Sequence, residues 1–364
     1  MIIVLIGTRA QLIKMAPVMT KMEASNLEYL FVLTGQHKNT MMDLVYQFGI
    51  KTKPHLIYSG KEVDGIIKVP AWFIICIINF IKFKNNTLSG LINNKHIILV
   101  HGDTFSTLLG SILAKLISAR LFHVEAGLRS YNLFHPFPEE LTRLITFYLS
   151  NVSFCPGEFA FNNMAKYKTE QINTVQNTLI DATRHVLNET QKNKEEVNYC
   201  VCSIHRFENI FFKHRFLHII SLLKKISRQI EIRFVLHPST RKRLVKYDLL
   251  EELEQNPEFQ LMDRMIYTDF IHLLSSAKFV ITDGGSNQEE LYYMGIPTLL
   301  MRRHTERQEG LSSTVLLSNY DEKKIIGFVN DYSRYRQATP LINQKISPSE
   351  IIVDYLKKQS CSSQ

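Results

Sequence analysis

Short apolar runs alternate with longer amphipathic stretches along the first half of the chain. Apolar runs of this length are typical of buried strands, and the amphipathic stretches are typical of helices that connect parallel strands. The alternation therefore predicts a parallel sheet covered by helices. The strands are expected at residues 2–6, 30–33, 97–100, 121–124 and 152–154.

The same alternation begins again after a polar stretch at residues 191–198. Two successive series predict two doubly wound α/β domains, because 364 residues are too many for one comfortable core. The strands of the second series are expected at residues 199–204, 232–236, 279–282 and 298–300.

The domain boundary is expected between Tyr167 and Asn177, before a helix that contains the sequence DATRHVL. The chain also ends in a stretch that is typical of a helix. We therefore predict a first Rossmann-like domain over 1–172, a nucleotide-binding Rossmann-like domain over 173–344, and a C-terminal helix within 345–364 that packs back on the first domain.

One segment, 69–83, is almost uniformly apolar and is flanked by Lys68, Lys82 and Lys84. It is too short to span a bilayer, which takes about 20 apolar residues. A helix that is apolar on most sides is usually buried in a core, and this is the reading we favour. The alternative is docking of 69–83 at a membrane surface, with the lysines at the lipid headgroups.

Composition and charge narrow the class of protein only slightly. The chain is 45% hydrophobic and 21% charged, as is ordinary for a folded protein. Its net charge of +9 favours anionic partners, but the basic residues are scattered and we find no nucleic-acid motif. Five cysteines without a CxxC pair predict reduced thiols, and the apolar run after Met1 has no charged leader, so we expect a cytoplasmic location.

Polar clusters follow the predicted strands at the point where each strand ends. Ligands bind open α/β sheets outside the carboxyl ends of the strands, so we expect these clusters to form one interdomain active site. The clusters are GTR at 7–9, TGQH at 34–37, HGDT at 101–104 and EAG at 125–127 in the first domain, and SIHR at 203–206, HP at 237–238 and TDGGS at 282–286 in the second.

Four carboxylates, Asp103, Glu125, Glu139 and Glu140, lie beside apolar sequence. An ionised carboxylate at the edge of a core is costly unless it is paired, hydrogen-bonded or used in chemistry. A shared active-site cleft explains all four residues. For Asp103 alone, a role as the cap of a helix that begins near Ser106 is an equally good explanation.

A glycine pair in the sequence DGGSNQEE connects a predicted strand to a predicted helix. The first turn of such a helix has free N–H groups and a partial positive charge, which bind phosphate. Glu290 can accept the two hydroxyls of a ribose, and Arg9 and Arg307 can neutralise a diphosphate. The alternatives are a plain strand-to-helix turn and, for Arg307, a surface ion pair with Glu306 or Glu309. We find no cluster with metal-ligand spacing.

Several motifs occur in one order along almost the whole chain: GTRAQLIKMAPV, TGQH, VHGDT, HVEAGLRS, PFPEE, NTLIDA, HRFEN and TDGGSNQEE…GIPTLLMR…TER. In that order and spacing they resemble the UDP-N-acetylglucosamine 2-epimerase family. The resemblance implies a GT-B type fold, with a UDP-sugar between two Rossmann-like domains and no external cofactor. A homodimer is also expected from the family.

The C2 hydrogen of an N-acetylhexosamine is not next to a carbonyl, so its direct removal gives no stabilised carbanion. Loss of UDP from C1 together with the C2 proton gives 2-acetamidoglucal, which can be reprotonated on the opposite face before UDP returns. The resemblance implies that Asp103, Glu125 and Glu139 surround C2 and the sugar ring and that His205 lies beside the diphosphate. The residues expected to bind the substrate are Arg9, Lys14, Gln36, His37, Arg129, Arg206, His237, Gly284, Gly285, Ser286, Glu290 and Arg307.

We therefore predict interconversion of UDP-GlcNAc and UDP-ManNAc for surface polysaccharide synthesis. The turn Gly284-Gly285-Ser286 departs from the family's usual Ser-Gly-Gly order but keeps the backbone donors, and residues 7–15 are closer to the non-hydrolysing branch. The sequence PHLIYSGKEVDG has no clear counterpart of the loop that binds an activating second UDP-GlcNAc, so no such control is predicted. The alternatives are a hydrolysing epimerase that releases ManNAc, a GT-B glycosyltransferase that uses a UDP-sugar donor and a membrane-associated acceptor, and a non-catalytic binder.

Overall fold

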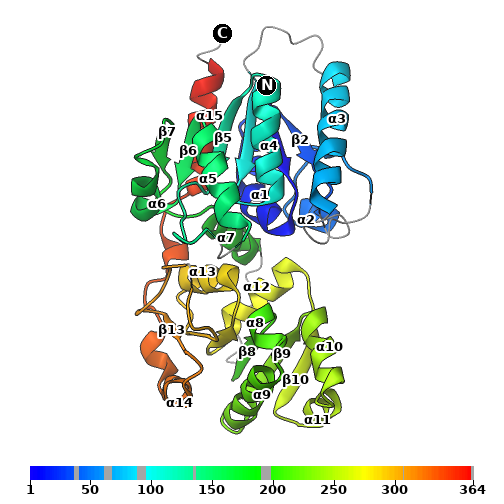
Figure 1. Cartoon of the computed structure of the whole chain (residues 1–364). Helices are drawn as coiled ribbons and strands as arrows, with labels where there is room; N and C mark the ends of the chain where they lie inside the picture. The colour runs from blue at the N-terminus through cyan, green and yellow to red at the C-terminus, as the bar shows by residue number, and fades with distance from the viewer. Residues whose placement is uncertain are drawn as a thin grey trace. The chain divides into compact units, whose positions relative to one another are not determined.

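The chain forms two compact α/β units in the computed structural model (Figure 1). The first unit contains residues 1–185 and 346–364, and the second contains residues 186–345. The predicted boundary at residue 172 stays a prediction, because a compact unit need not be an independently folding domain. The structure describes residues 1–36, 41–60, 68–87, 96–133, 137–189, 198–305 and 307–361.

The first unit is built on a parallel sheet with the strand order β3-β2-β1-β4-β5-β6-β7. Its central strands are the apolar runs of the sequence, and they are buried along their length because helices cover the sheet. The strands are β1 Ile2–Ile6, β2 Tyr29–Leu33, β3 His55–Leu56, β4 Ile97–His101, β5 Arg120–Val124, β6 Val152–Cys155 and β7 Glu170–Asn173.

Helices connect these strands, and α3, α4 and α5 lie side by side in one layer (Figure 1). The C-terminal helix α15 belongs to this unit and packs against α1. The helices are α1 Arg9–Ala24, α2 Met41–Gln47, α3 Val69–Thr87, α4 Phe105–Leu116, α5 Glu139–Leu149, α6 Gly157–Met164, α7 Leu179–Glu189 and α15 Pro348–Cys361.

Helix α3 contains the apolar segment that the sequence analysis favoured as a core helix. One face is buried, where Trp72, Cys76 and Phe80 are at most 1% exposed and the Trp72 indole N–H donates to the Thr34 carbonyl at 3.0 Å. The other face is exposed and carries isoleucines, so the predicted burial is confirmed for one face and wrong for the other. The exposed side chains are Ile74, Ile75, Ile78 and Ile81. Among the helices of the described part, none is both long and apolar enough to cross a membrane.

The second unit has a parallel sheet with the strand order β10-β9-β8-β11-β12-β13. Numbered from the first strand of each unit, both sheets begin 3-2-1-4-5-6, which is the Rossmann order. Every predicted strand is present, so the predicted α/β class with two Rossmann-like sheets is confirmed. The strands are β8 Tyr199–Ser203, β9 Glu231–Leu236, β10 Phe259–Asp263, β11 Val280–Thr282, β12 Thr298–Leu300 and β13 Val315–Leu317.

An apolar cluster of strand and helix side chains forms a core of the second unit and includes Cys200 and Cys202. The four cysteines whose side chains are described are free and buried, as predicted for reduced thiols. The helices of this unit are α8 Phe207–Ile210, α9 Lys213–Ser227, α10 Pro238–Lys246, α11 Leu250–Glu254, α12 Tyr267–Ser276, α13 Gly285–Met294 and α14 Glu322–Asn330, with short 3-10 helices η2 Tyr332–Tyr335 and η3 Leu341–Asn343.

Candidate functional site

The polar motifs of each unit lie at the switch point of its sheet, where the direction of strand order reverses. This point is between β1 and β4 in the first unit and between β8 and β11 in the second. Ligands of doubly wound sheets bind outside the carboxyl ends of the strands at such points. The GTR and HGDT motifs stand there in the first unit, and the SIHR and DGGS motifs stand there in the second.

Gly7, directly after β1, allows helix α4 to approach the sheet closely. A Cβ on this glycine would lie 1.7 Å from Ser106 Oγ and 2.5 Å from Thr34 Oγ1, so no larger residue fits. Ser106 contacts Thr34 Oγ1 at 2.8 Å and donates to Gln36 Oε1 at 2.7 Å. The predicted binding residue Gln36 is therefore held at the switch point. Its predicted neighbour His37 lies outside the described residues.

Glu125 follows β5 directly, and polar groups of other elements surround its side chain. Its Oε2 accepts hydrogen bonds from Lys14 Nζ of α1 and from Asn177 Nδ2, and it lies 3.6 Å from His101 Nε2. Its backbone has a left-handed φ of 64°, which costs about 1–2 kcal/mol for a residue with a Cβ. The side chain is only 7% exposed, so a buried ammonium group matches a buried carboxylate.

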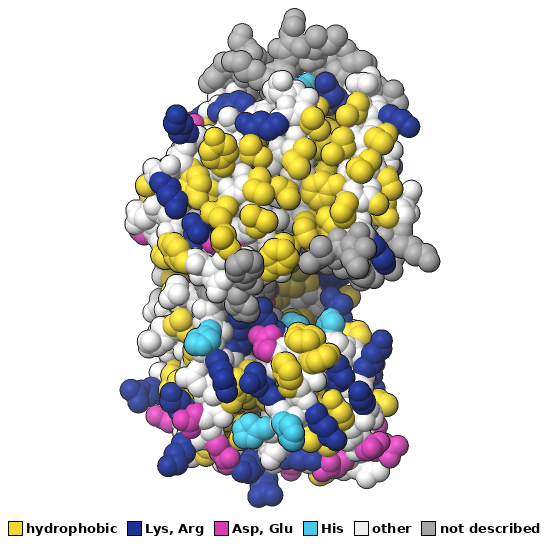
Figure 2. Space-filling view, in the orientation of Figure 1, with side chains coloured by type: hydrophobic (Ala, Val, Ile, Leu, Met, Phe, Trp, Pro, Cys, Tyr) yellow, Lys and Arg dark blue, Asp and Glu magenta, His cyan; other side chains and the backbone are white. Residues whose placement is uncertain are grey.

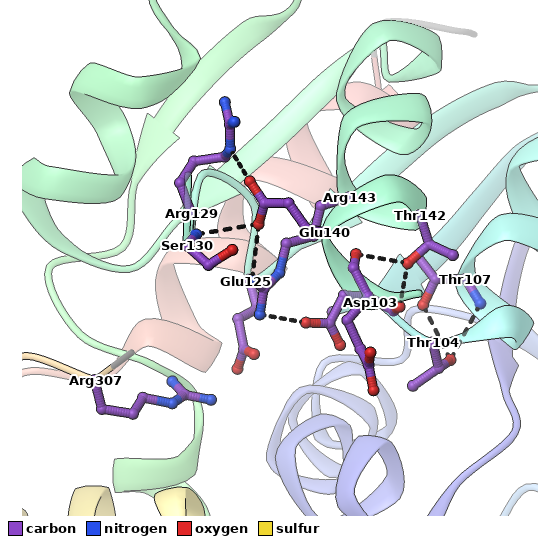
Figure 3. Close-up of polar contacts among 12 residues, drawn as sticks. Asp103, Thr104, Thr107, Glu125, Arg129, Ser130, Glu140, Thr142, Arg143 and Arg307 are labelled. Atoms are coloured by element: carbon purple, nitrogen blue, oxygen red, sulfur yellow. Dashed lines mark hydrogen bonds and ion pairs between the residues drawn. The ribbon is translucent and has the colours of Figure 1, made fainter. Parts of the chain in front are cut away.

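Arg143 of α5 links two more carboxylates (Figure 3). Its Nη2 lies 2.5 Å from Asp103 Oδ2, and its Nη1 lies 3.2 Å from Glu140 Oε2. The fully buried Glu140 also accepts hydrogen bonds from Arg129 Nε and, at 3.1 Å, from the Ser130 N–H. Burial alone raises the pKa of Glu140, but these hydrogen bonds outweigh it and hold the pKa below its usual range.

Asp103 does not cap helix α4. The N-cap is Thr104, whose hydroxyl oxygen accepts a hydrogen bond from the Thr107 N–H at 3.3 Å, so the capping explanation of Asp103 is wrong. The Asp103 carbonyl accepts a hydrogen bond from the Thr142 hydroxyl, which ties this loop to α5 (Figure 3). The Asp103 carboxylate is 23% exposed and is therefore accessible to a ligand on one side while Arg143 holds it on the other.

Glu139 is the first residue of α5, and it is the least compensated of these carboxylates. Its Oε2 is shielded from solvent and accepts no hydrogen bond from any described residue. A buried oxygen without a partner costs about 1–3 kcal/mol, so a carboxylate in this state is unusual in a purely structural role. The positive end of the α5 dipole favours its negative charge.

The second unit places a glycine turn at the start of helix α13. Gly284 is the N-cap, and a Cβ on it would lie 2.6 Å from Asn287 Oδ1, so the turn requires a glycine there. Gly285 and Ser286 form the first turn of α13, where backbone N–H groups have no partner within the helix. Glu290, one turn further along, is 4% exposed.

Arg307 is bound to this same helix by an ion pair that the sequence analysis did not consider. Its Nη1 lies 3.0 Å from Oε2 of the fully buried Glu289. The partners expected from the sequence were Glu309 and Glu306, and Glu306 lies outside the described residues. The Gln288 side chain also donates to the Arg307 carbonyl at 3.3 Å and to the Glu309 carbonyl at 2.9 Å. The loop that carries Arg307 is therefore attached to α13 through two of its residues.

Histidine and arginine side chains surround the end of β8. The rings of His205 and His237 are 5.6 Å apart, and His205 Nδ1 lies 3.3 Å from Oδ1 of the fully buried Asp283. Burial and the nearby positive charges lower the pKa of His237. Arg206 Nη1 is shielded from solvent and has no hydrogen-bond partner in the part of the chain that the structure describes. This region therefore has donor capacity for an anion.

The UDP-N-acetylglucosamine 2-epimerase family model matches residues 20–348. The chain belongs to this family. It is 31% identical to the UDP-N-acetylglucosamine 2-epimerase of Campylobacter jejuni, with 86% of this chain and 84% of the relative covered. It is 30% identical to that of Neisseria meningitidis serogroup A, with 98% and 99% covered.

Solved structures agree with this assignment. The UDP-GlcNAc 2-epimerase of Neisseria meningitidis bound to UDP-GlcNAc aligns with a TM-score of 0.80 at 27% identity, and the alignment covers 98% of this chain and 99% of that one. The Methanocaldococcus jannaschii enzyme in complex with UDP-GlcNAc and UDP aligns with a TM-score of 0.77 at 26% identity and the same coverage. The predicted family and the predicted GT-B type fold are confirmed.

Several residues around the polar clusters of the two units were not among the predicted ones. They are partners of residues in the predicted polar clusters. Glu140 and Asp283 were included in those clusters, as charged residues beside apolar sequence. Arg143 stands one turn after Glu140 on the same helix. The missed residues are Asn177, Arg143, Asn209 and Glu289.

His123 of β5 is a core histidine, and it makes stability depend on pH. Its Nε2 contacts the Gly102 carbonyl at 2.7 Å, and burial lowers its pKa to about 4 from an ordinary 6.5. As the pH falls, the unfolded chain takes up a proton on His123 before the folded protein does, so the contribution of His123 to stability is greatest above pH 6.5. We expect the free energy of unfolding to fall by up to about 3 kcal/mol as the pH drops towards 4.

We expect His123→Gln to remove this contribution, measured as a smaller loss of unfolding free energy in urea between pH 7 and pH 5. His214→Gln is the matched control, because His214 is exposed in the second unit. The same loss with pH in His123→Gln and in the unchanged protein would contradict the assignment.

Proposed function

We propose that this protein interconverts UDP-GlcNAc and UDP-ManNAc by elimination and re-addition of UDP. The observation that carries the proposal is the set of carboxylates in the first unit, with Asp103 and Glu125 at strand ends and Glu139 at the start of α5, in a chain of this family. A protein that only bound a nucleotide sugar would gain little from several acids at the edge of the core. The relatives with bound UDP-GlcNAc and UDP support a UDP-sugar as the substrate.

The elimination step breaks the C1–O bond, whose electron pair leaves with UDP. A base takes the proton from C2, and the C1–C2 double bond of 2-acetamidoglucal forms. Return of a proton to the opposite face of C2, followed by re-addition of UDP, completes the inversion. The reaction therefore needs acid–base groups around C2 and an anion site for the diphosphate.

The surroundings of the three carboxylates suggest different roles for them. Glu125 already accepts hydrogen bonds from Lys14 and Asn177, so it is poorly placed to take a further proton, and we assign it a fixed electrostatic and binding role. Asp103 is held by Arg143 but partly exposed, and Glu139 has an oxygen without a partner among the described residues. These two are the residues that we assign to proton transfer at C2.

The second unit has the groups that an anionic nucleotide needs. We assign the diphosphate to the first turn of α13 at Gly284, Gly285 and Ser286, with His205 and Arg206 beside it. The ribose is assigned to Glu290. Arg307, His237, Arg9, Lys14, Gln36, His37 and Arg129 stay predicted binding residues.

A broad apolar surface of the first unit supports the expected homodimer. We define the apolar face as the exposed apolar side chains of α3, α4 and α5. Figure 2 shows hydrophobic side chains gathered on the first unit. A twofold dimer uses the same surface on both copies, and the centres of homodimer interfaces are apolar and poor in charge. The apolar face comprises Ile74, Ile75, Ile78, Ile81, Leu116, Leu141, Ile145 and Tyr148.

Membrane docking of 69–83 is the alternative use of this surface. Lys68, Lys82 and Lys84 stand at the ends of α3 and Lys115 is exposed at the end of α4, but α5 has no exposed basic side chain to meet an anionic headgroup. We therefore favour the dimer. The cytoplasmic location and the role in surface polysaccharide synthesis also stay proposals.

The reaction itself is tested with UDP-GlcNAc in D₂O. We expect deuterium at C2 and formation of UDP-ManNAc. Free ManNAc with UDP would instead indicate a hydrolysing enzyme, and neither exchange nor turnover with intact UDP binding would indicate a transferase.

We expect Asp103→Asn to lower the rate of C2 deuterium exchange by about 100-fold or more while UDP affinity stays nearly unchanged. The amide keeps the size of the side chain but cannot accept the proton. Asp43→Asn is the matched control, since Asp43 is an exposed residue of α2 in the same unit. Normal exchange in Asp103→Asn would show that the pocket is assigned wrongly.

We expect Glu290→Gln to weaken UDP binding by roughly 10-fold to 100-fold in calorimetry. The amide keeps only one of the two oxygens that accept hydrogen bonds from the ribose hydroxyls. Glu251→Gln in the exposed part of α11 is the control. An unchanged UDP affinity of folded Glu290→Gln would exclude this ribose site.

We expect the protein to have twice the mass of its 42.3 kDa chain in light scattering, and Ile78→Glu to have the mass of one chain. Burial of a charge in an apolar interface costs more than a dimer of this kind can compensate. Ile266→Glu, at an exposed isoleucine of the second unit, is expected to stay dimeric. A monomer that sediments with phosphatidylglycerol vesicles would instead support membrane docking.

A further inference from the structure

Asp283, directly after β11 and before the glycine turn of the second unit, is a fully buried carboxylate. Its oxygens accept hydrogen bonds from the His205 N–H at 3.1 and 3.0 Å and from the Arg206 N–H at 2.9 Å. A third donor, Asn209 Nδ2, reaches it at 2.9 Å. The carboxylate therefore holds the backbone of the loop that carries His205.

Asp283 also faces the His205 side chain. Its Oδ1 lies 3.3 Å from Nδ1 of the imidazole, and the His205 side chain remains 36% exposed. The ring lies beside the start of α13, because a Cβ on Gly284 would be 3.3 Å from His205 Cε1. One edge of the imidazole is thus held by a carboxylate, and the ring stands at a helix end that favours anions.

A second layer fixes the orientation of the Asn209 amide. The Tyr320 hydroxyl donates to Asn209 Oδ1 at 2.6 Å, so Nδ2 is the atom that remains for donation. Nδ2 donates both to Asp283 Oδ2 and to the Met301 carbonyl, each at 2.9 Å. Without the Tyr320 hydroxyl, the Asn209 amide could turn its oxygen towards the Asp283 carboxylate. The two oxygens would then repel each other.

We propose that Asp283 is a positioning residue for His205, and that Tyr320 and Asn209 hold Asp283 in place for this role. Asp283 selects the tautomer with the proton on Nδ1, which leaves Nε2 for the ligand. When a diphosphate lies against Nε2, the ring carries both protons and donates one to Asp283 and one to a phosphoryl oxygen. The imidazolium then offsets the negative charge that UDP gains as the C1–O bond breaks.

This inference rests on the proposed function, in which His205 binds the departing diphosphate. A purely structural Asp283, which only accepted the backbone N–H groups of the loop, would have different consequences. Its loss would change the free energy of unfolding but not the tautomer of His205. It would also affect turnover equally whether or not the imidazole was present.

The first test is the tautomer of His205 in protein labelled with 15N-histidine. The His205 signal is identified by its absence in His205→Gln. We expect Nδ1 to be protonated and Nε2 unprotonated in the free protein, and both to be protonated after addition of UDP. In Asp283→Asn we expect no fixed tautomer. A His205 signal that is the same in Asp283→Asn and in the unchanged protein would overturn the proposal.

The second test is a double-mutant cycle on C2 exchange. We expect Asp283→Asn to lower kcat by about 100-fold with KM within about 3-fold, and to lower it by less than about 3-fold when His205→Gln is already present. Equal losses in the two backgrounds would show that Asp283 does not act through His205.

A milder variant covers the case in which Asp283→Asn does not fold. We expect Tyr320→Phe to lower kcat by about 3-fold to 10-fold and to loosen the tautomer preference of His205. Tyr335→Phe, the same change on η2 against the same core cluster, is expected to keep kcat within about 2-fold. Equal kcat values for the two variants would remove Tyr320 and Asn209 from the proposal.

The two proposals fail in distinguishable ways. A protein without C2 exchange would refute the proposed function, while its His205 spectrum would still report on the contact with Asp283. An active protein with an unconstrained His205 would refute only the role of Asp283.

Discussion

The compensation of buried carboxylates at the ends of parallel strands is the constraint on which both units depend. Glu125 and Asp283 each follow an apolar strand and are matched by donors from other elements: Glu125 by Lys14 of α1 and by Asn177, and Asp283 by the loop after β8. Glu140, in the first turn of α5, is matched by Arg129 of the preceding loop and by Arg143 of its own helix. Removing one partner of such a pair costs about 3–5 kcal/mol, because the remaining charge stays buried. These contacts therefore join the helices and loops to the sheet as well as shaping the site.

The groups that lack such compensation are as informative as those that have it. Glu139 Oε2 and Arg206 Nη1 are both shielded from solvent without a hydrogen-bond partner among the residues that the structure describes. One is an acceptor beside the carboxylates of the first unit, and the other is a donor beside the glycine turn of the second. Arg206 also lies near a carboxylate, since its Nε is 3.6 Å from Glu208 Oε1, but its Nη1 makes no hydrogen bond there. A buried polar atom without a hydrogen bond has a cost, and contacts with a bound substrate would offset it.

The central strands could be predicted from the sequence, and the missed strands have one physical feature in common. β3, β7, β10 and β13 are the edges of the two sheets, and helices and neighbouring strands cover them on fewer sides. Partly exposed strands need no continuous apolar run, as the sequence EQIN of β7 shows. The site followed the same rule. Residues at strand ends could be predicted from their local context, whereas the Tyr320 to Asn209 contact joins positions 111 residues apart and leaves no local pattern.

Helix α3 shows what a uniformly apolar helix can mean. Its buried face repeats every four residues at Trp72, Cys76 and Phe80, which is the period expected for packing on a core. A helix with only this partner would have polar residues on its other face, yet that face carries Ile74 and Ile78. Apolarity on both faces is what a helix with two apolar partners would show. The core of the first unit is one partner, and the proposed second copy of the chain would be the other, because a face in lasting contact with water would favour polar side chains.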